Sequence, residues 1–258
     1  MAPSFALAFA STPAPAMSAS RAVFTAVQAV SCTLAWTPPR KTPEKGRYNT
    51  DALKALQIAP LIFGLQSYVV YAVALLETLA LVSPSLLESS PLLSPLSNLS
   101  CPTSSPSAIH VTPAFILGTF LVVSGAALRL KCFGTLGQLF TFDLTIHPSH
   151  TLVTSGPYAW VRHPSYTGSM MMVAGVAIAL FTPGGWVNEC LVGGAGGVAA
   201  FTTGKWALYA LWASWWSWTV SVGVTRARAE DGEMRKLFGA EWDAWSARVN
   251  SWFVPGIW

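Results

Sequence analysis

Val111–Leu128 reads VTPAFILGTFLVVSGAAL, a run that contains no charged side chain. A helix needs about 20 mostly apolar residues to cross a bilayer, so this run predicts a membrane span. Three further runs predict spans of the same kind: Gln57–Val82, in which Glu77 is the one charge, Pro164–Asn188 and Trp206–Thr225. These four runs indicate that membrane helices determine the fold class.

A shorter apolar run, Ala22–Trp36, is a candidate either for a first span or for a cleaved targeting segment. No Lys or Arg precedes the apolar stretch Phe5–Ala10, so the positively charged start of a signal peptide is missing. We therefore favour an uncleaved span. The sequence thus predicts an all-α integral membrane protein with about five transmembrane helices.

The amino-acid composition agrees with a membrane protein. Hydrophobic residues make up 52% of the 258 residues and charged residues 10%, against roughly 25% charged residues in soluble domains. The apolar fraction excludes a disordered chain. The net charge of +4 is too small and too scattered for a nucleic-acid groove, so we expect no nucleic acid among the partners.

Lys and Arg are distributed asymmetrically among the loops. Of the 15 basic residues, all but Arg21 and Lys205 fall in segments that the alternation of five spans places on one face. Short loops rich in Lys and Arg stay on the cytoplasmic side of a membrane, so this face is predicted to be cytosolic. The opposite, lumenal face receives the Ser/Pro-rich loop Ser83–Ser107 and the Gly-rich connection Pro183–Lys205.

The cysteines and histidines show no metal-site or disulfide-scaffold spacing. Four residues could in principle bind a metal, but they lack the short ligand spacings of a closed site: Cys132, His147, His150 and His163. We therefore expect no bound metal. Cys101 and Cys190 both fall on the predicted lumenal face, and the sequence leaves open whether they form a disulfide.

Polar side chains that could take part in catalysis gather in two stretches of the predicted cytosolic face, Asp143–Tyr166 and Arg226–Asp243. In the first, Pro164 suits the first turn of a helix, so Arg162 and His163 are expected where a helix enters the membrane. Such a helix start presents free backbone N–H groups and a positive dipole end, which favour a carboxylate or another anion. The alternative interpretation of these two residues is an interfacial basic anchor.

In the second stretch, Arg226 and Glu230 stand four residues apart and therefore share one helix face. By itself such a pair is an ordinary ion pair that stabilises an exposed helix by about 0.2 to 0.5 kcal/mol. It acquires functional meaning only together with the first stretch.

Together the two stretches closely resemble the isoprenylcysteine carboxyl methyltransferase family. The resemblance covers about Leu128–Pro255 and rests on His150–Gly156 (HTLVTSG), Tyr158, Arg162–Tyr166 (RHPSY) with Gly168, Arg226 with Glu230, Phe238–Gly239 and Val254–Pro255. Asp231 stands where members of the family commonly carry a second glutamate.

This resemblance implies the cofactor S-adenosyl-L-methionine and a role for each motif residue. Arg226 and Glu230 would be catalytic, with Arg226 binding the carboxylate of the substrate. The residues that the resemblance assigns to the cofactor are His150, Thr151, Leu152, Val153, Tyr158, His163, Pro164, Ser165, Tyr166 and Glu230.

The resemblance also implies partners and a location. The substrate would be the prenylated C-terminal cysteine of lipidated proteins such as small GTPases, and the surroundings the lipid bilayer. We expect a multi-pass protein of the endoplasmic reticulum membrane whose active site faces the cytosol.

The chain is accordingly expected to divide into three regions. Residues 1–56 form an N-terminal segment with a candidate first span and a basic cytosolic linker, and residues 57–130 hold two spans joined by the Ser/Pro-rich lumenal loop. Residues 131–258 form the catalytic methyltransferase region with the last membrane hairpin and a cytosolic C-terminal helix. The cofactor pocket is expected between the loop before the fourth span and this C-terminal helix.

The implied reaction suits these residue types. A C-terminal carboxylate has an ordinary pKa of about 3.3 to 3.7 and is already ionised in the cytosol, so no general base is required. A guanidinium can hold it through two parallel hydrogen bonds, which lysine cannot do.

Two other functions remain as alternatives. A phospholipid N-methyltransferase would share membrane helices and related cofactor motifs, but an amine acceptor favours a carboxylate opposite it rather than Arg226. A non-catalytic membrane protein or transporter would carry ionisable groups at mid-membrane depth, and in the predicted spans only Glu77 does so.

Overall fold

The computed structural model describes residues 15–39, 59–89, 101, 109–142, 151–192 and 197–257, and these residues are mostly helical. The long helices are α1 (Pro15–Trp36), α3 (Ala59–Ser89), α5 (Pro113–Leu136), α6 (Pro164–Phe181) and α7 (Gly197–Phe238), followed by the short α8 (Ala240–Arg248). The shorter turns are η4 (Gly137–Leu139), η5 (Gly156–Ala159) and the π-helical η6 (Val187–Val192). Within the described part of the chain an isolated bridge between Val254 and Ile257 is the one β feature, so the all-α prediction is confirmed.

Three of the described helices are long and apolar enough to cross a membrane. The candidate spans are Leu61–Val82 in α3, Pro113–Leu139 in α5 with η4, and Pro164–Phe181 in α6, and they correspond to three of the predicted runs. Helices also form at the two remaining runs, as α1 and α7, but neither is among these candidate spans. A multi-pass membrane protein is therefore supported, while the count of five spans stays a prediction.

Two predicted boundaries were wrong. The first helix begins at Pro15 rather than Ala22, which brings Arg21 into it. The predicted run Pro164–Asn188 is not one helix, because α6 ends at Phe181 and a separate π-helical turn follows. The break lies at Thr182–Gly185, where a proline cannot continue the helical hydrogen bonds and Gly184 adopts a φ of 81°.

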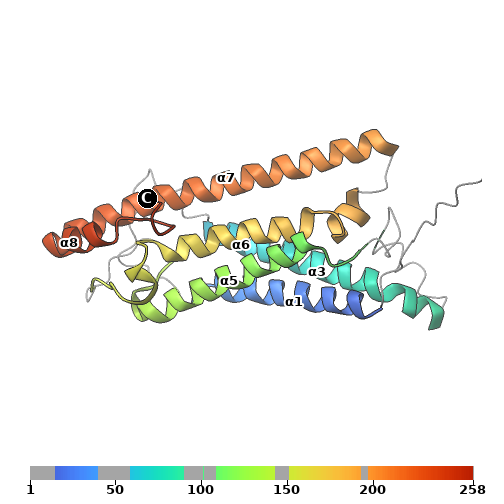
Figure 1. Ribbon diagram of the computed structural model, residues 1–258, viewed down its shortest axis with the longest axis horizontal. Coiled ribbons are helices and arrows are strands. Elements are labelled where there is room, and N and C mark those ends of the chain that lie inside the picture. The colour runs from blue at the N-terminus through green and yellow to red at the C-terminus, as the bar shows by residue number, and fades with distance from the viewer. Residues whose placement is uncertain are drawn as a thin grey trace, which may run out of the picture.

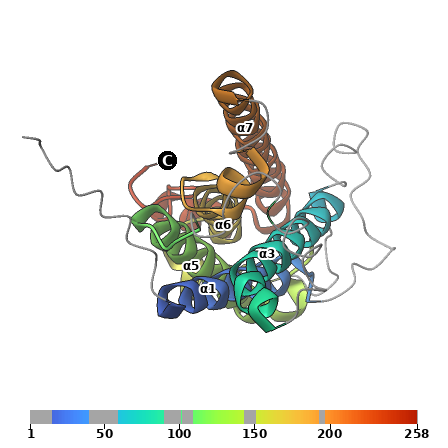
Figure 2. The same ribbon diagram turned by 90° about the vertical axis from the view of Figure 1, so that its right-hand side faces the viewer.

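The helices α5 and α6 are antiparallel neighbours that form the centre of the molecule (Figure 1). Viewed along the bundle, α6 lies between α7 and the group formed by α1, α3 and α5 (Figure 2). The close approach of α5 and α6 depends on two pairs of glycines. A Cβ atom added to Gly125 would lie 2.6 Å from the carbonyl oxygen of Gly168, and one added to Gly118 would lie 2.6 Å from that of Gly175. Small residues let helix backbones touch where lipid removes the hydrophobic driving force for helix association.

We expect Gly125→Ala to lower the free energy of unfolding by about 1 to 3 kcal/mol, because its methyl group would force the two backbones apart. The matched control is Gly134→Ala in the same helix, where an added Cβ meets nothing within 4 Å. That control should be neutral or should stabilise by about 0.5 to 1 kcal/mol, since alanine is the better helix former. Thermal unfolding in detergent measures both, and equal effects of the two substitutions would contradict the packing argument.

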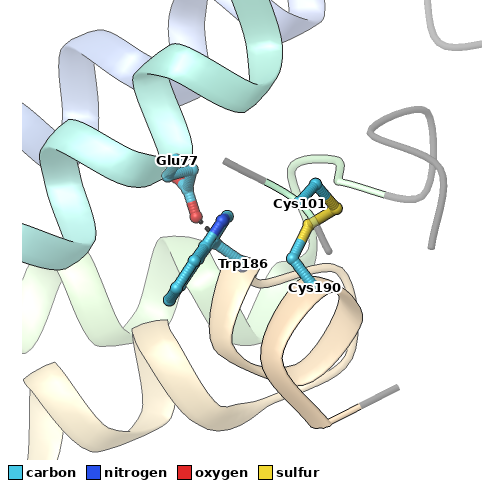
Figure 3. Close-up of a disulfide and its surroundings, with 4 residues drawn as sticks. All are labelled: Glu77, Cys101, Trp186 and Cys190. Atoms are coloured by element: carbon cyan, nitrogen blue, oxygen red, sulfur yellow. Dashed lines mark hydrogen bonds between the residues drawn. A yellow bond between two sulfur atoms is a disulfide. The ribbon is translucent and has the colours of Figure 1, made fainter. Parts of the chain in front are cut away.

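A disulfide and a buried ion pair lie near one another at the C-terminal end of α6. Cys101 and Cys190 form a disulfide, so the pairing that the sequence left open is decided. Beside it, the backbone N–H of Trp186 donates to Glu77 Oε2 at 3.2 Å (Figure 3). The disulfide ties residue 101 to the π-helical turn after α6.

The sequence shows Glu77 as the one charge in its predicted span, but in the structure this carboxylate has a charged partner. Its carboxylate pairs with Arg21 of α1, whose Nε lies 2.9 Å from Oε1, and both side chains are completely buried. Thr25 Oγ1 donates to the same carboxylate at 2.8 Å, and the guanidinium also lies 3.9 Å from the ring centre of Phe115. The pair therefore connects α1, α3 and α5.

Candidate active site

At the opposite end of α6, about 27 Å away at 1.5 Å per residue, the structure contains a cavity of about 220 Å³. It is enclosed by the start of α6, the C-terminal part of α7 and the segments around residues 139–142 and 151–153. Nine of the residues that the resemblance assigned line it: Thr151, Leu152, Val153, Tyr158, His163, Ser165, Tyr166, Arg226 and Glu230. Pro164 is buried at the first position of α6 without lining the cavity, and His150 lies outside the described residues.

Two adjacent carboxylates of α7 hold the start of α6. Tyr166 Oη donates to Glu230 Oε1, and His163 Nδ1 lies 3.4 Å from Glu230 Oε2. The other ring nitrogen of His163, Nε2, lies 2.9 Å from Asp231 Oδ1. Arg162 Nη1 donates to Asp231 Oδ2 at 2.6 Å. These contacts join two segments more than sixty residues apart into one network.

His163 has an acceptor on each side of its ring, and an imidazole donates from both nitrogens only when it is protonated. Burial alone lowers the pKa of His163, but the hydrogen bonds to Asp231 and Glu230 raise it by more, so the pKa lies above its ordinary value of 6.5. Burial likewise raises the pKa of Glu230, and the facing His163 outweighs this, so that pKa lies below 4.5. Both shifts favour the charged forms of His163 and Glu230.

This raised pKa makes a testable contribution to stability. Because the folded pKa of His163 exceeds the unfolded value, its contribution is complete below about pH 6.5 and is lost as the pH rises through the folded pKa. We expect the melting temperature of the wild type to fall over this range relative to that of His163→Gln. Parallel melting curves of the two proteins from pH 6 upward would show that the imidazole is not protonated in the folded state.

Arg226 is placed by the segment that precedes the first motif. Its side chain is 10% exposed, and Nη2 donates to the carbonyl oxygen of Phe142 and lies 3.9 Å from Glu230 Oε1. The guanidinium also lies 5.9 Å from the ring centre of Tyr166. The ion pair with Glu230 expected from the sequence is therefore present at the cavity, not on an exposed helix face.

The two backbone amides that immediately precede α6 are occupied, although the sequence predicts free N–H groups at this helix start. The N–H groups of Arg162 and His163 donate to the carbonyl oxygens of Ser251 and Trp252, each at 2.9 Å. The C-terminal segment after α8 thus occupies donors that the sequence had left for an anion. Side chains rather than these two amides must therefore provide the contacts of an anion in the cavity.

The sequence analysis did not assign two polar residues of the site. Asp231 had counted only as a departure from the family pattern, yet it holds both Arg162 and His163. Arg129 had counted only as a loop charge, yet it is buried and lines the cavity. The signal for Asp231 was its place next to Glu230 on one helix, whereas nothing local marked Arg129. Among the described residues, no group of three or more His, Cys, Asp or Glu could hold a metal.

Comparison with known proteins agrees with the motifs. Residues 116–192 match the model of the isoprenylcysteine carboxyl methyltransferase (ICMT) family. The chain is 39% identical over 80 residues to the protein-S-isoprenylcysteine O-methyltransferase of Homo sapiens, an alignment covering 30% of this chain and 28% of that protein. It is 33% identical over 109 residues to the Xenopus laevis protein of the same name, covering 42% of this chain and 34% of the relative.

A further relative is the probable protein-S-isoprenylcysteine O-methyltransferase of Oryza sativa subsp. indica, which is 26% identical over 137 residues. That alignment covers 52% of this chain and 58% of the relative. The chain thus matches less than two thirds of the length of each of these proteins. The matches confirm the resemblance drawn from the motifs, and the similar proteins are named as enzymes.

Proposed function

We propose that this protein is an S-adenosylmethionine-dependent methyltransferase that esterifies the C-terminal carboxylate of a prenylated cysteine. The observation that carries the proposal is the meeting of Arg226 and Glu230 with His163 and Tyr166 at one cavity. These residues come from the two stretches on which the resemblance rests. The named relatives support the same reaction class.

The residues around the cavity fit the cofactor that the resemblance implies. Glu230 offers a carboxylate for a cationic or hydroxylated group, while Leu152, Phe140 and Trp245 offer apolar and aromatic walls for a flat ring. When bound, S-adenosylmethionine supplies a methyl group on a sulfonium sulfur, from which a carboxylate oxygen displaces a neutral thioether as the methyl ester forms.

Arg226 would orient the acceptor carboxylate. Its guanidinium is largely desolvated, and its bond to the Phe142 carbonyl and its proximity to Glu230 hold it in one direction. Fixed charges act more strongly in such a site than in water, and reaction needs the attacking oxygen to be held in line. Because the carboxylate is already ionised, the chain needs to provide no base.

The apolar part of the substrate would enter from the bilayer. Met170, Val222 and Gly223 line the cavity where α6 and α7 lead from the polar network into their apolar segments. A prenyl chain partitions into lipid at about 0.8 kcal/mol per buried CH₂, so it is already at membrane depth. We propose that the shape of this apolar wall and the geometry at Arg226 together provide specificity.

We further propose the endoplasmic reticulum membrane as location, with the cavity facing the cytosol. The asymmetry of Lys and Arg supports this orientation. The disulfide between Cys101 and Cys190 lies at the other end of α6, and disulfides persist in oxidising compartments such as the reticulum lumen.

Transfer of labelled methyl groups from S-adenosylmethionine tests the proposal. Membranes carrying this protein would be incubated with N-acetyl-S-farnesylcysteine or with a phospholipid acceptor. Base-labile label in the farnesylcysteine supports the proposal. Label in phospholipid alone would assign an amine acceptor, and absence of transfer from well-folded protein would leave a non-catalytic membrane protein.

A further inference from the structure

Arg129 is a buried cation in the wall of the cavity. It lies in α5 near the end of its candidate span, is 4% exposed and faces the start of α6. Its Nε donates to the carbonyl oxygen of Ala35 at 2.8 Å. Its Nη1 donates to Ser165 Oγ at 3.1 Å and to Ser169 Oγ at 2.5 Å. The side chain is therefore held firmly by α1 and α6.

The partners of Arg129 among the described residues are all uncharged, unlike those of Arg21, Arg162 and Arg226. Arg21 pairs with Glu77, Arg162 with Asp231, and Arg226 lies beside Glu230. The described residues place no carboxylate within ion-pair distance of Arg129, and its Nη2 has no hydrogen-bond acceptor among them. A buried charge is costly unless an opposite charge compensates it.

The surroundings of Arg129 suit an anion that enters the cavity. Its guanidinium lies 5.5 Å from the ring centre of Phe133 and 5.3 Å from that of Phe142. Phe142 also provides the carbonyl oxygen that holds Arg226, so one short segment lies between the two cations. Aromatic walls exclude water and strengthen the attraction between a fixed guanidinium and a carboxylate.

We infer that Arg129 binds a carboxylate of a ligand in this cavity, as a second anion-binding residue beside Arg226. This inference rests on the proposed function, which brings two carboxylates to the site. One belongs to the amino-acid part of the cofactor and the other to the C-terminus of the prenylcysteine. Both have the same chemistry, and the experiment below separates them.

The experiment measures equilibrium binding to the full-length protein in detergent, so it does not depend on turnover. Arg129→Met removes the charge, and Arg129→Lys keeps a charge without the planar fork. The matched control is Lys131→Met, which removes an exposed cation two residues further along the same helix and outside the cavity. Thermal unfolding of each variant reports the structural part of the effect.

Each pair of probes compares a ligand that carries the carboxylate with one that lacks it. S-adenosylhomocysteine is compared with methylthioadenosine, which lacks the amino-acid part, and N-acetyl-S-farnesylcysteine is compared with its carboxamide. Loss of a charge-assisted hydrogen bond should weaken one acid-bearing probe by about tenfold to a hundredfold and leave its neutral counterpart nearly unchanged. Selective weakening of S-adenosylhomocysteine assigns the cofactor carboxylate, and selective weakening of the farnesylcysteine acid assigns the substrate.

Two results would overturn the inference in distinguishable ways. If the wild type binds the probes and Arg129→Met lowers the melting temperature while weakening acid and neutral probes equally, Arg129 only ties α1 to α6. If the wild type binds neither S-adenosylhomocysteine nor the farnesylcysteine, the proposed function fails and the inference with it.

Discussion

Arg226→Ala is expected to lower methyl transfer to N-acetyl-S-farnesylcysteine by at least about a hundredfold, as happens when a buried group that stabilises reacting charge is removed. The guanidinium is the cation beside Glu230 at the cavity, and it is the group that we propose orients the acceptor carboxylate. Arg226→Lys should also lose most of the turnover, because an ammonium cannot keep the bond to Phe142 and form two parallel bonds to a carboxylate.

The matched control is Arg228→Ala, which removes an exposed positive charge two residues further along the same helix and outside the cavity. Initial rates at saturating S-adenosylmethionine give kcat and KM for each variant. Wild-type kcat/KM in Arg226→Lys, in a protein that melts normally, would contradict the assignment of the substrate carboxylate to Arg226.

The largest effect on stability is expected at the buried pair of Arg21 and Glu77. Glu77→Leu leaves a guanidinium with no exposure and without its carboxylate, and breaking such a pair costs about 3 to 5 kcal/mol. Arg21→Met should cost a similar amount, since it strands the carboxylate. The double variant Arg21→Met/Glu77→Leu should recover most of the loss, because no uncompensated charge then remains.

Unfolding of the four proteins in detergent completes a double-mutant cycle. The comparison pair is Lys236 with Glu233, whose atoms lie 2.8 Å apart, close to the 2.9 Å of the buried pair, but whose lysine side chain is 72% exposed. Lys236→Met should change stability by less than about 0.5 kcal/mol, as is usual for surface pairs within a helix. Additive losses in the double variant of Arg21 and Glu77 would mean that the two side chains do not act as a pair.

Parts of the site could be predicted from local sequence because their residues lie close together along the chain. Pro164 predicted the start of α6, and the motif around it places His163, Ser165 and Tyr166 within one helical turn. The spacing of Arg226 and Glu230 predicted their shared face. Only the resemblance predicted that these two groups of residues lie together at one site. No periodic pattern links residues 64 positions apart, as Tyr166 and Glu230 are.

The break after α6 shows that hydropathy alone does not predict where a helix ends. Thr182–Gly185 contains the strongest helix-breaking residues of the run. The prediction nevertheless extended the span to Asn188, because it was based on hydropathy alone. The π-helical turn that follows is held by the disulfide to Cys101 and by contacts that the chain makes only when folded. Similarly, the backbone amides of Arg162 and His163, just before α6, are occupied by a C-terminal segment that no local pattern places there.

The sequence by itself determined where the apolar helices lie and which segments carry the polar chemistry. This follows because a backbone in lipid must satisfy its hydrogen bonds within each helix, so a long uncharged run has few alternatives. Only the tertiary structure decided the partner of each buried charge, namely that Glu77 meets Arg21, that Asp231 holds Arg162, and that Arg129 faces the cavity with neutral partners. The two ion pairs join residues 56 and 69 positions apart, and they depend on helix packing in space, which local sequence does not encode.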